Sequence, residues 1–153
     1  MIRVNVEVDN KSWHRKIKNP KNYFKKKLKK FSKNIKLFKN KNITFTILLT
    51  SSANMKKLNK KFRKRDKATD VLSFPFLLPN RLKLIRKKNI YLGDIATSYE
   101  IVNSRSKRDS FLHEFDKVWI HGFLHLVGYD HIKNKDYLKM SKLEEKILNS
   151  ISI

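Results

Sequence analysis

The chain has 153 residues and no cysteine, and 40% of its residues are hydrophobic. This length predicts a single domain, residues 1–153, and the composition excludes a disordered chain. The lack of cysteine excludes a disulfide framework and thiolate ligands for zinc, and it favours a reducing, cytoplasmic location. Because the sequence shows neither a signal peptide nor an apolar run of about 18 residues, we expect no membrane association.

The net charge is +24, from 37 basic and 13 acidic residues. Such a surface attracts polyanions, of which nucleic acid is the commonest. However, the basic residues comprise 29 Lys and only 8 Arg, a pattern typical of A/T-biased codons that place lysine on solvated faces. Both interpretations stay open, and the charge alone does not name a partner.

In the first half of the chain, strands and helices are predicted to alternate. Residues 2–8 and 43–49 alternate apolar with polar residues, which predicts two half-buried strands. Residues 22–38 carry apolar residues at spacings of three and four, which predicts a lysine-covered amphipathic helix. Residues 50–52 are capping residues for a further helix. Its apolar positions are Met55, Leu58 and Phe62.

The second half is predicted to add two strands and three helices. Residues 71–74 and 90–97 read as strands, separated by a basic loop at 77–90. A helix is expected from about Ser98 to Asn103, and a longer one from about Asp109 to near Val127. A last amphipathic helix has the apolar positions Tyr137, Met140, Leu143, Ile147 and Ile151. The fold class is therefore α+β, a small four-stranded mixed sheet with about five packed helices.

The segment H-G-F-L-H-L-V-G-Y-D-H, residues 121–131, is the main functional signal. His121 and His125 are four residues apart, so a helix places them one turn apart on one face, as in zincins. A continuous helix would carry His131 roughly 15 Å away from His121. The helix must therefore end, and Gly128 stands where a left-handed stop is needed.

Three neutral histidines with an open fourth position are typical of a catalytic zinc site, and we expect one Zn²⁺ per chain. The spacing is that of the metzincin proteases, but position 122 is Gly, so their catalytic Glu is missing. Asp130 could act as a general base or as an acceptor that orients a ligand imidazole, and the second role is favoured. Asp94, which follows Gly93, is a further candidate to support this region.

Two further segments form a group of motifs with the histidine segment. They are L-N-K-K-F-R-K-R-D-K-A-T-D-V-L-S-F-P-F at 58–76 and L-G-D-I-A at 92–96. Together with the histidine segment they resemble the YbeY family of bacterial endoribonucleases, the rRNA maturation factors. The resemblance implies a zinc-dependent endoribonuclease that prefers single strands and acts in maturation of the 16S rRNA 3′ end and in ribosome quality control. It also implies the small ribosomal subunit, a small-subunit ribosomal protein and the GTPase Era as partners.

By position, His121, His125 and His131 match the family's metal ligands, and Arg63 matches its functional arginine. From the residues alone, a surface cation beside Lys64 and Arg65 is the favoured interpretation of Arg63, and the family resemblance reverses this preference. If it faces the metal site, its planar fork can bind phosphate and stabilise developing charge.

Two other functions compete with the nuclease. One is a metzincin-like protease, which the missing Glu disfavours. The other is a non-catalytic, zinc-stabilised ribosome assembly factor.

Overall fold

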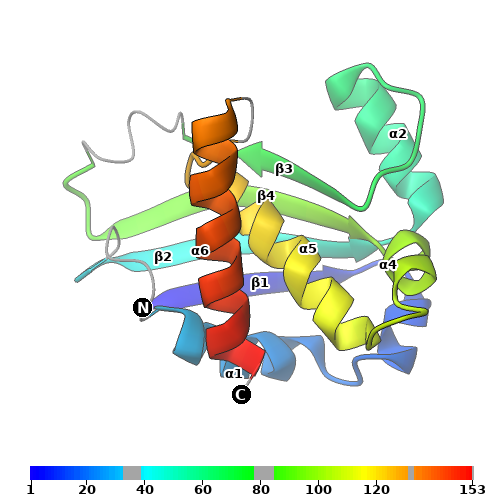
Figure 1. Cartoon of the computed structure of the whole chain (residues 1–153), viewed down its shortest axis with the longest axis horizontal. Coiled ribbons are helices and arrows are strands. Elements are labelled where there is room, and N and C mark those ends of the chain that lie inside the picture. The colour runs from blue at the N-terminus through cyan, green and yellow to red at the C-terminus, as the bar shows by residue number, and fades with distance from the viewer. Residues whose placement is uncertain (33–38, 78–84, 131–132, 153) are drawn as a thin grey trace.

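A four-stranded mixed sheet runs through the molecule, with helices on both faces (Figure 1). The computed structural model describes residues 1–32, 39–77, 85–130 and 133–152. The strands are β1 (Ile2–Val8), β2 (Asn42–Thr50), β3 (Val71–Pro75) and β4 (Asn89–Ser98). The helices of this part are η1 (Lys11–Arg15, 3₁₀), α1 (Pro20–Phe31), α2 (Ser52–Arg63), α4 (Tyr99–Arg105), α5 (Phe111–Leu126) and α6 (Asn134–Ser152).

The strand order is β1-β2-β4-β3. β2 pairs in parallel with both β1 and β4, whereas β3 pairs antiparallel with β4 at the edge of the sheet. The prediction of an α+β fold with a small four-stranded mixed sheet and about five helices is confirmed. No helix in the described part of the chain has the length and apolar character needed to cross a bilayer.

The main core lies between one face of the sheet and the helices α1, α5 and α6 (Figure 1). It is rich in aromatic side chains because α1 and α5 each present them towards the sheet and towards each other. The largest fully buried aromatic residues are Trp13, Phe24, Phe31, Phe45, Phe115, Trp119 and Phe123. This packing fixes α5, which carries the histidines, firmly against the sheet.

One carboxylate is buried inside this aromatic core. Asp116 of α5 accepts hydrogen bonds from the Tyr23 hydroxyl, from Lys27 Nζ at 2.8 Å and from Trp119 Nε1 at 2.9 Å. A buried carboxylate is tolerated when its lone pairs are used in this way. Asp116 therefore ties α1 to α5.

The opposite face of the sheet carries a second, smaller cluster under α2. Met55 packs there with Leu72 and Ala96. Phe62, which the sequence assigned to the same apolar stripe, is instead 54% exposed, and its ring lies against Phe74 with centroids 5.3 Å apart. The buried part of the stripe is therefore shorter than predicted.

Several boundaries differ from the sequence-based prediction. The first helix spans Pro20–Phe31, capped by Asn19, rather than 22–38, and residues 33–38 lie outside the described part. The expected loop at 77–90 is only partly described, and β4 already begins at Asn89. The helix η1 was not predicted. It buries Trp13 completely, and the indole donates to the Thr50 carbonyl at 2.9 Å.

Candidate active site

Helix α5 begins and ends on local signals. The Ser110 hydroxyl accepts a hydrogen bond from the His113 amide at its start. At its end, Gly128 adopts φ = +98°, and its amide donates to the His125 carbonyl at 3.1 Å. The Tyr129 amide closes the turn on the Leu124 carbonyl at 3.0 Å. These two bonds form a Schellman motif, so the predicted stop at Gly128 is confirmed.

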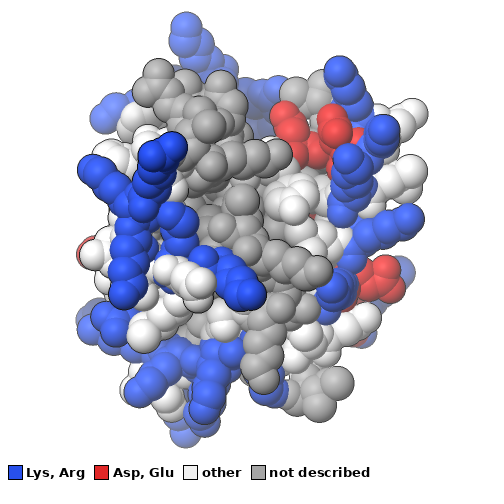
Figure 2. Space-filling model, turned by 90° about the vertical axis from the view of Figure 1, so that its left-hand side faces the viewer, with Lys and Arg blue, Asp and Glu red and all other residues white. Residues whose placement is uncertain are grey.

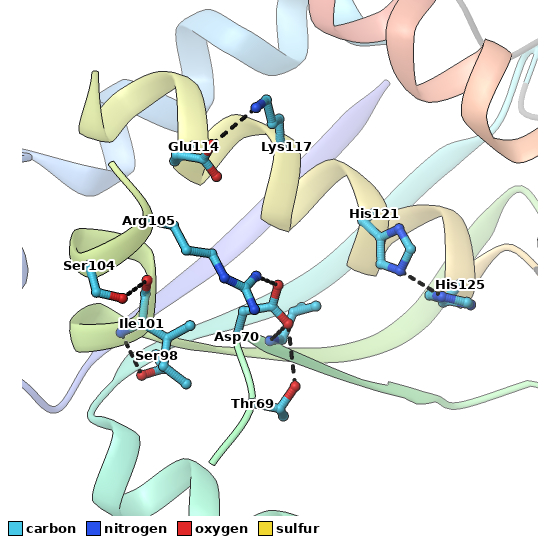
Figure 3. Close-up of polar contacts among 11 residues, drawn as sticks. Thr69, Asp70, Ser98, Ile101, Ser104, Arg105, Glu114, Lys117, His121 and His125 are labelled. Atoms are coloured by element: carbon cyan, nitrogen blue, oxygen red, sulfur yellow. Dashed lines mark hydrogen bonds and ion pairs between the residues drawn. The ribbon is translucent and has the colours of Figure 1, made fainter. Parts of the chain in front are cut away.

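His121 and His125 face each other from successive turns of α5 (Figure 3). Their Nε2 atoms lie 3.0 Å apart, and both rings are half-buried. Two nitrogens bound tetrahedrally to one zinc at about 2.1 Å lie roughly 3.4 Å apart. The pair therefore fits a shared metal ion with only a small adjustment. His131, the third expected ligand, lies outside the described residues, and no group of three possible ligands is assembled within them.

The other ring nitrogen of His121 has a partner that sequence reasoning missed. Its Nδ1 lies 2.6 Å from Glu144 Oε1 on α6. The contact spans 23 positions of sequence and depends on how α6 packs on α5. The apolar periodicity of α6 gave no signal for it.

Arg63, the last residue of α2, lies at the same pocket. Its Nη2 donates to the Ser73 carbonyl at 2.8 Å, and the Ser73 hydroxyl donates to the Gly122 carbonyl at 2.7 Å. The guanidinium is thus connected through β3 to the helical turn that carries His121. The pocket has a volume of about 520 Å³. Its lining comprises Arg63, Thr69, Asp70, Val71, Leu72, Ser73, Pro75, His121, His125, Gly128, Tyr129 and Asp130.

The two candidate aspartates are placed differently. Asp130 follows the turn at Gly128 and lines the pocket with an exposed side chain. The structure does not bring Asp94 to this pocket. β4 has one extra residue opposite Thr44–Thr46, so Asp94 lies on the same face as Tyr91, from which it accepts a hydrogen bond, and it lines a different pocket. Asp94 therefore does not line the pocket that contains the histidines, contrary to the prediction.

Asp70 is a pocket residue that sequence reasoning did not single out. Its carboxylate accepts hydrogen bonds from the Val71 amide at 2.8 Å and from Arg105 of α4 (Figure 3). Its carbonyl accepts from the Ser98 amide at 3.0 Å. Asp70 thus fixes the start of β3, and Arg105 offsets its negative charge at the pocket wall. The only sequence signal was its position before the strand V-L-S-F.

The chain matches one protein family over nearly its whole length. The family model described as Endoribonuclease YbeY matches residues 7–152. The chain belongs to this family.

Two relatives agree with the YbeY assignment, and one solved structure has a similar fold. Endoribonuclease YbeY of Pelagibacter ubique (strain HTCC1062) is 49% identical over 155 residues, covering 99% of this chain and 97% of the relative. Endoribonuclease YbeY of Chelativorans sp. (strain BNC1) is 39% identical, covering 72% and 67%. The solution structure of TM1509 from Thermotoga maritima is similar at a TM-score of 0.62 and 27% identity, covering 99% of this chain and 89% of that one.

Gly122 shows why this YbeY-family chain lacks the protease Glu. A Cβ at this position would lie 2.8 Å from Val71 Cγ2 and 3.1 Å from Ile95 Cγ2. These side chains belong to β3 and β4, so position 122 faces the sheet rather than the pocket. Gly122 allows α5 to approach the sheet closely, and a catalytic Glu would have no room there.

Proposed function

We propose that the chain is a zinc-dependent endoribonuclease that cleaves single-stranded RNA. The observation that carries this proposal is the pocket shared by His121, His125 and Arg63 in a chain of the YbeY family. It combines a pair of imidazole nitrogens suited to one metal ion with a cation suited to phosphate.

The zinc would be held by His121 and His125, with His131 as the third ligand by its spacing in the motif. Bound there, zinc would supply a water of lowered pKa and Lewis-acid stabilisation of a phosphoryl oxygen. Imidazole nitrogens without thiolates suit this ion and leave a coordination position open. The 3.0 Å separation of the two Nε2 atoms supports this role.

Arg63 is proposed to bind the scissile phosphate. Its bond to the Ser73 carbonyl holds one edge of the guanidinium against the pocket wall. Because a guanidinium carries five N–H donors, others can be directed to phosphate oxygens. Such a donor is fixed before the reaction, so it stabilises charge that develops on the oxygens without reorganisation.

One face of the molecule carries many basic side chains, which suits a polyanionic substrate (Figure 2). Lys and Arg side chains cover much of the face seen in Figure 2, whereas acidic side chains gather mainly towards its right-hand side. Contacts from lysine to phosphate do not distinguish one base from another, so we expect RNA binding to tolerate many sequences. The proposed cellular role is maturation of the 16S rRNA 3′ end and ribosome quality control in the cytoplasm. The proposed partners are the small ribosomal subunit, one of its proteins and the GTPase Era.

The test is cleavage of a defined RNA by the zinc-loaded wild type and by His125→Ala. The wild type should cut a single strand faster than the same sequence in a duplex, and His125→Ala should lose cleavage while staying folded. Casein serves as the control substrate for the protease alternative. Casein hydrolysis without RNA cleavage would overturn the proposal, and so would equal RNA cleavage by both proteins.

A further inference from the structure

Helix α6 carries a carboxylate on the side that packs against the body of the protein. Glu144 stands four residues after Met140 and three before Ile147, both of which are buried. These spacings place all three residues on neighbouring parts of one helix face. The Glu144 side chain is only 30% exposed, whereas the neighbouring Glu145 is exposed.

The contact that Glu144 makes determines how the His121 ring can be used. Glu144 Oε1 lies 2.6 Å from His121 Nδ1, and His121 Nε2 points towards His125 Nε2 at 3.0 Å. A carboxylate can only accept a hydrogen bond, so the proton of a neutral imidazole belongs on Nδ1. The lone pair is then on Nε2, on the pocket side of the ring.

We propose that Glu144 is a positioning residue that holds His121 in its Nδ1–H tautomer and fixes the orientation of the ring. The proposal rests on the proposed function in one respect, because zinc is the group that would use the Nε2 lone pair on the pocket side. Ligand histidines commonly donate their second nitrogen to such a carboxylate, which raises their basicity and limits rotation of the ring. The C-terminal helix would thereby contribute to a site whose other described residues come from α2, β3, α5 and the segments that adjoin them.

If the contact between Glu144 and His121 were only a structural ion pair, removing Glu144 would leave the zinc affinity and the His121 tautomer unchanged. Pairs that are partly open to solvent contribute little to stability. Removal of Glu144 should therefore change the metal affinity and the tautomer far more than it changes the melting temperature.

The experiment compares Glu144→Ala, Glu144→Gln and the matched control Glu145→Ala. Zinc affinity is measured by competition with a chelator, and the His121 tautomer by ¹⁵N NMR of metal-free protein at about pH 8.5, where imidazole is ordinarily neutral. Glu144→Ala should weaken zinc binding about 10- to 100-fold and give a mixture of tautomers. Glu144→Gln should be intermediate, because its carbonyl can still accept from Nδ1–H. Glu145→Ala should behave as the wild type.

The two readouts separate this inference from the proposed function. If the wild type binds no zinc, the metal part of the proposed function fails, and the tautomer still decides the role of Glu144. Glu144→Gln keeps the shape of the side chain and supplies the test if Glu144→Ala does not fold. A zinc affinity and a tautomer in Glu144→Ala equal to those of Glu145→Ala would overturn the inference. An unchanged tautomer alone in a folded, metal-free Glu144→Ala would also overturn it.

Discussion

Replacing Arg63 by alanine should slow RNA cleavage strongly while leaving the fold intact. The side chain is exposed, and its hydrogen bond in the described structure is to the Ser73 carbonyl. A hydrogen bond from a charged donor contributes at most about 1.5–3 kcal/mol to stability, and less where the side chain is exposed, as it is here. Losing one preorganised donor to the reacting phosphate costs about 2.7–4 kcal/mol in the transition state, or roughly 10²–10³ in rate. The catalytic effect should therefore exceed the structural one.

The assay is single-turnover cleavage at saturating enzyme, which isolates the chemical step from binding. Lys64→Ala and Arg65→Ala are the matched controls, since both remove a neighbouring cation. They should weaken RNA binding modestly and lower the salt slope by about one unit. Arg63→Lys should rescue poorly, because an ammonium lacks the planar fork. If all three alanine variants have equal and small effects on cleavage, Arg63 is only a solvated surface cation and its proposed role is refuted.

Three further outcomes are expected. Gly122→Glu restores the protease motif. It should destabilise the fold by about 3 kcal/mol or more in urea titrations, because position 122 faces Val71 and Ile95. A stable, proteolytic variant would contradict this. Burial beside Asp116 raises the pKa of Tyr23 above its ordinary 10.0. As the pH rises past 10, the Tyr23 hydroxyl therefore ionises in the unfolded state but not in the folded state. Stability should therefore fall there, and Tyr23→Phe should show a smaller fall in melting temperature between pH 8 and 11. RNA affinity should drop roughly 50-fold between about 50 and 200 mM salt if about four phosphates are contacted. An RNA affinity that does not change with salt would indicate that the positive charge of the chain reflects codon bias rather than RNA binding.

The parts of the site that lie on one helix were predictable from the sequence. A spacing of four places His121 and His125 on one face, and Gly128 ends the helix, because both features depend on neighbours within a few residues. The order of strands and helices followed from the same local periodicities. The boundaries moved by a few residues where capping residues such as Asn19 decided them.

The parts that depend on tertiary packing were not predictable. Glu144 reaches His121 only because α6 packs on α5, and its position in an apolar stripe does not reveal a polar partner. Asp94 was misplaced because an extra residue in β4 reverses the face to which the following side chain points. Trp13 was missed because η1 is too short to show a period.

Titration of metal-depleted protein with zinc, followed by the rate of single-stranded RNA cleavage, tests the central claim most directly. The rate should rise from near zero and level off at about one zinc per chain, in keeping with one three-histidine site. His125→Ala should stay inactive throughout the same titration. Full cleavage by a folded, metal-depleted wild type would contradict the account.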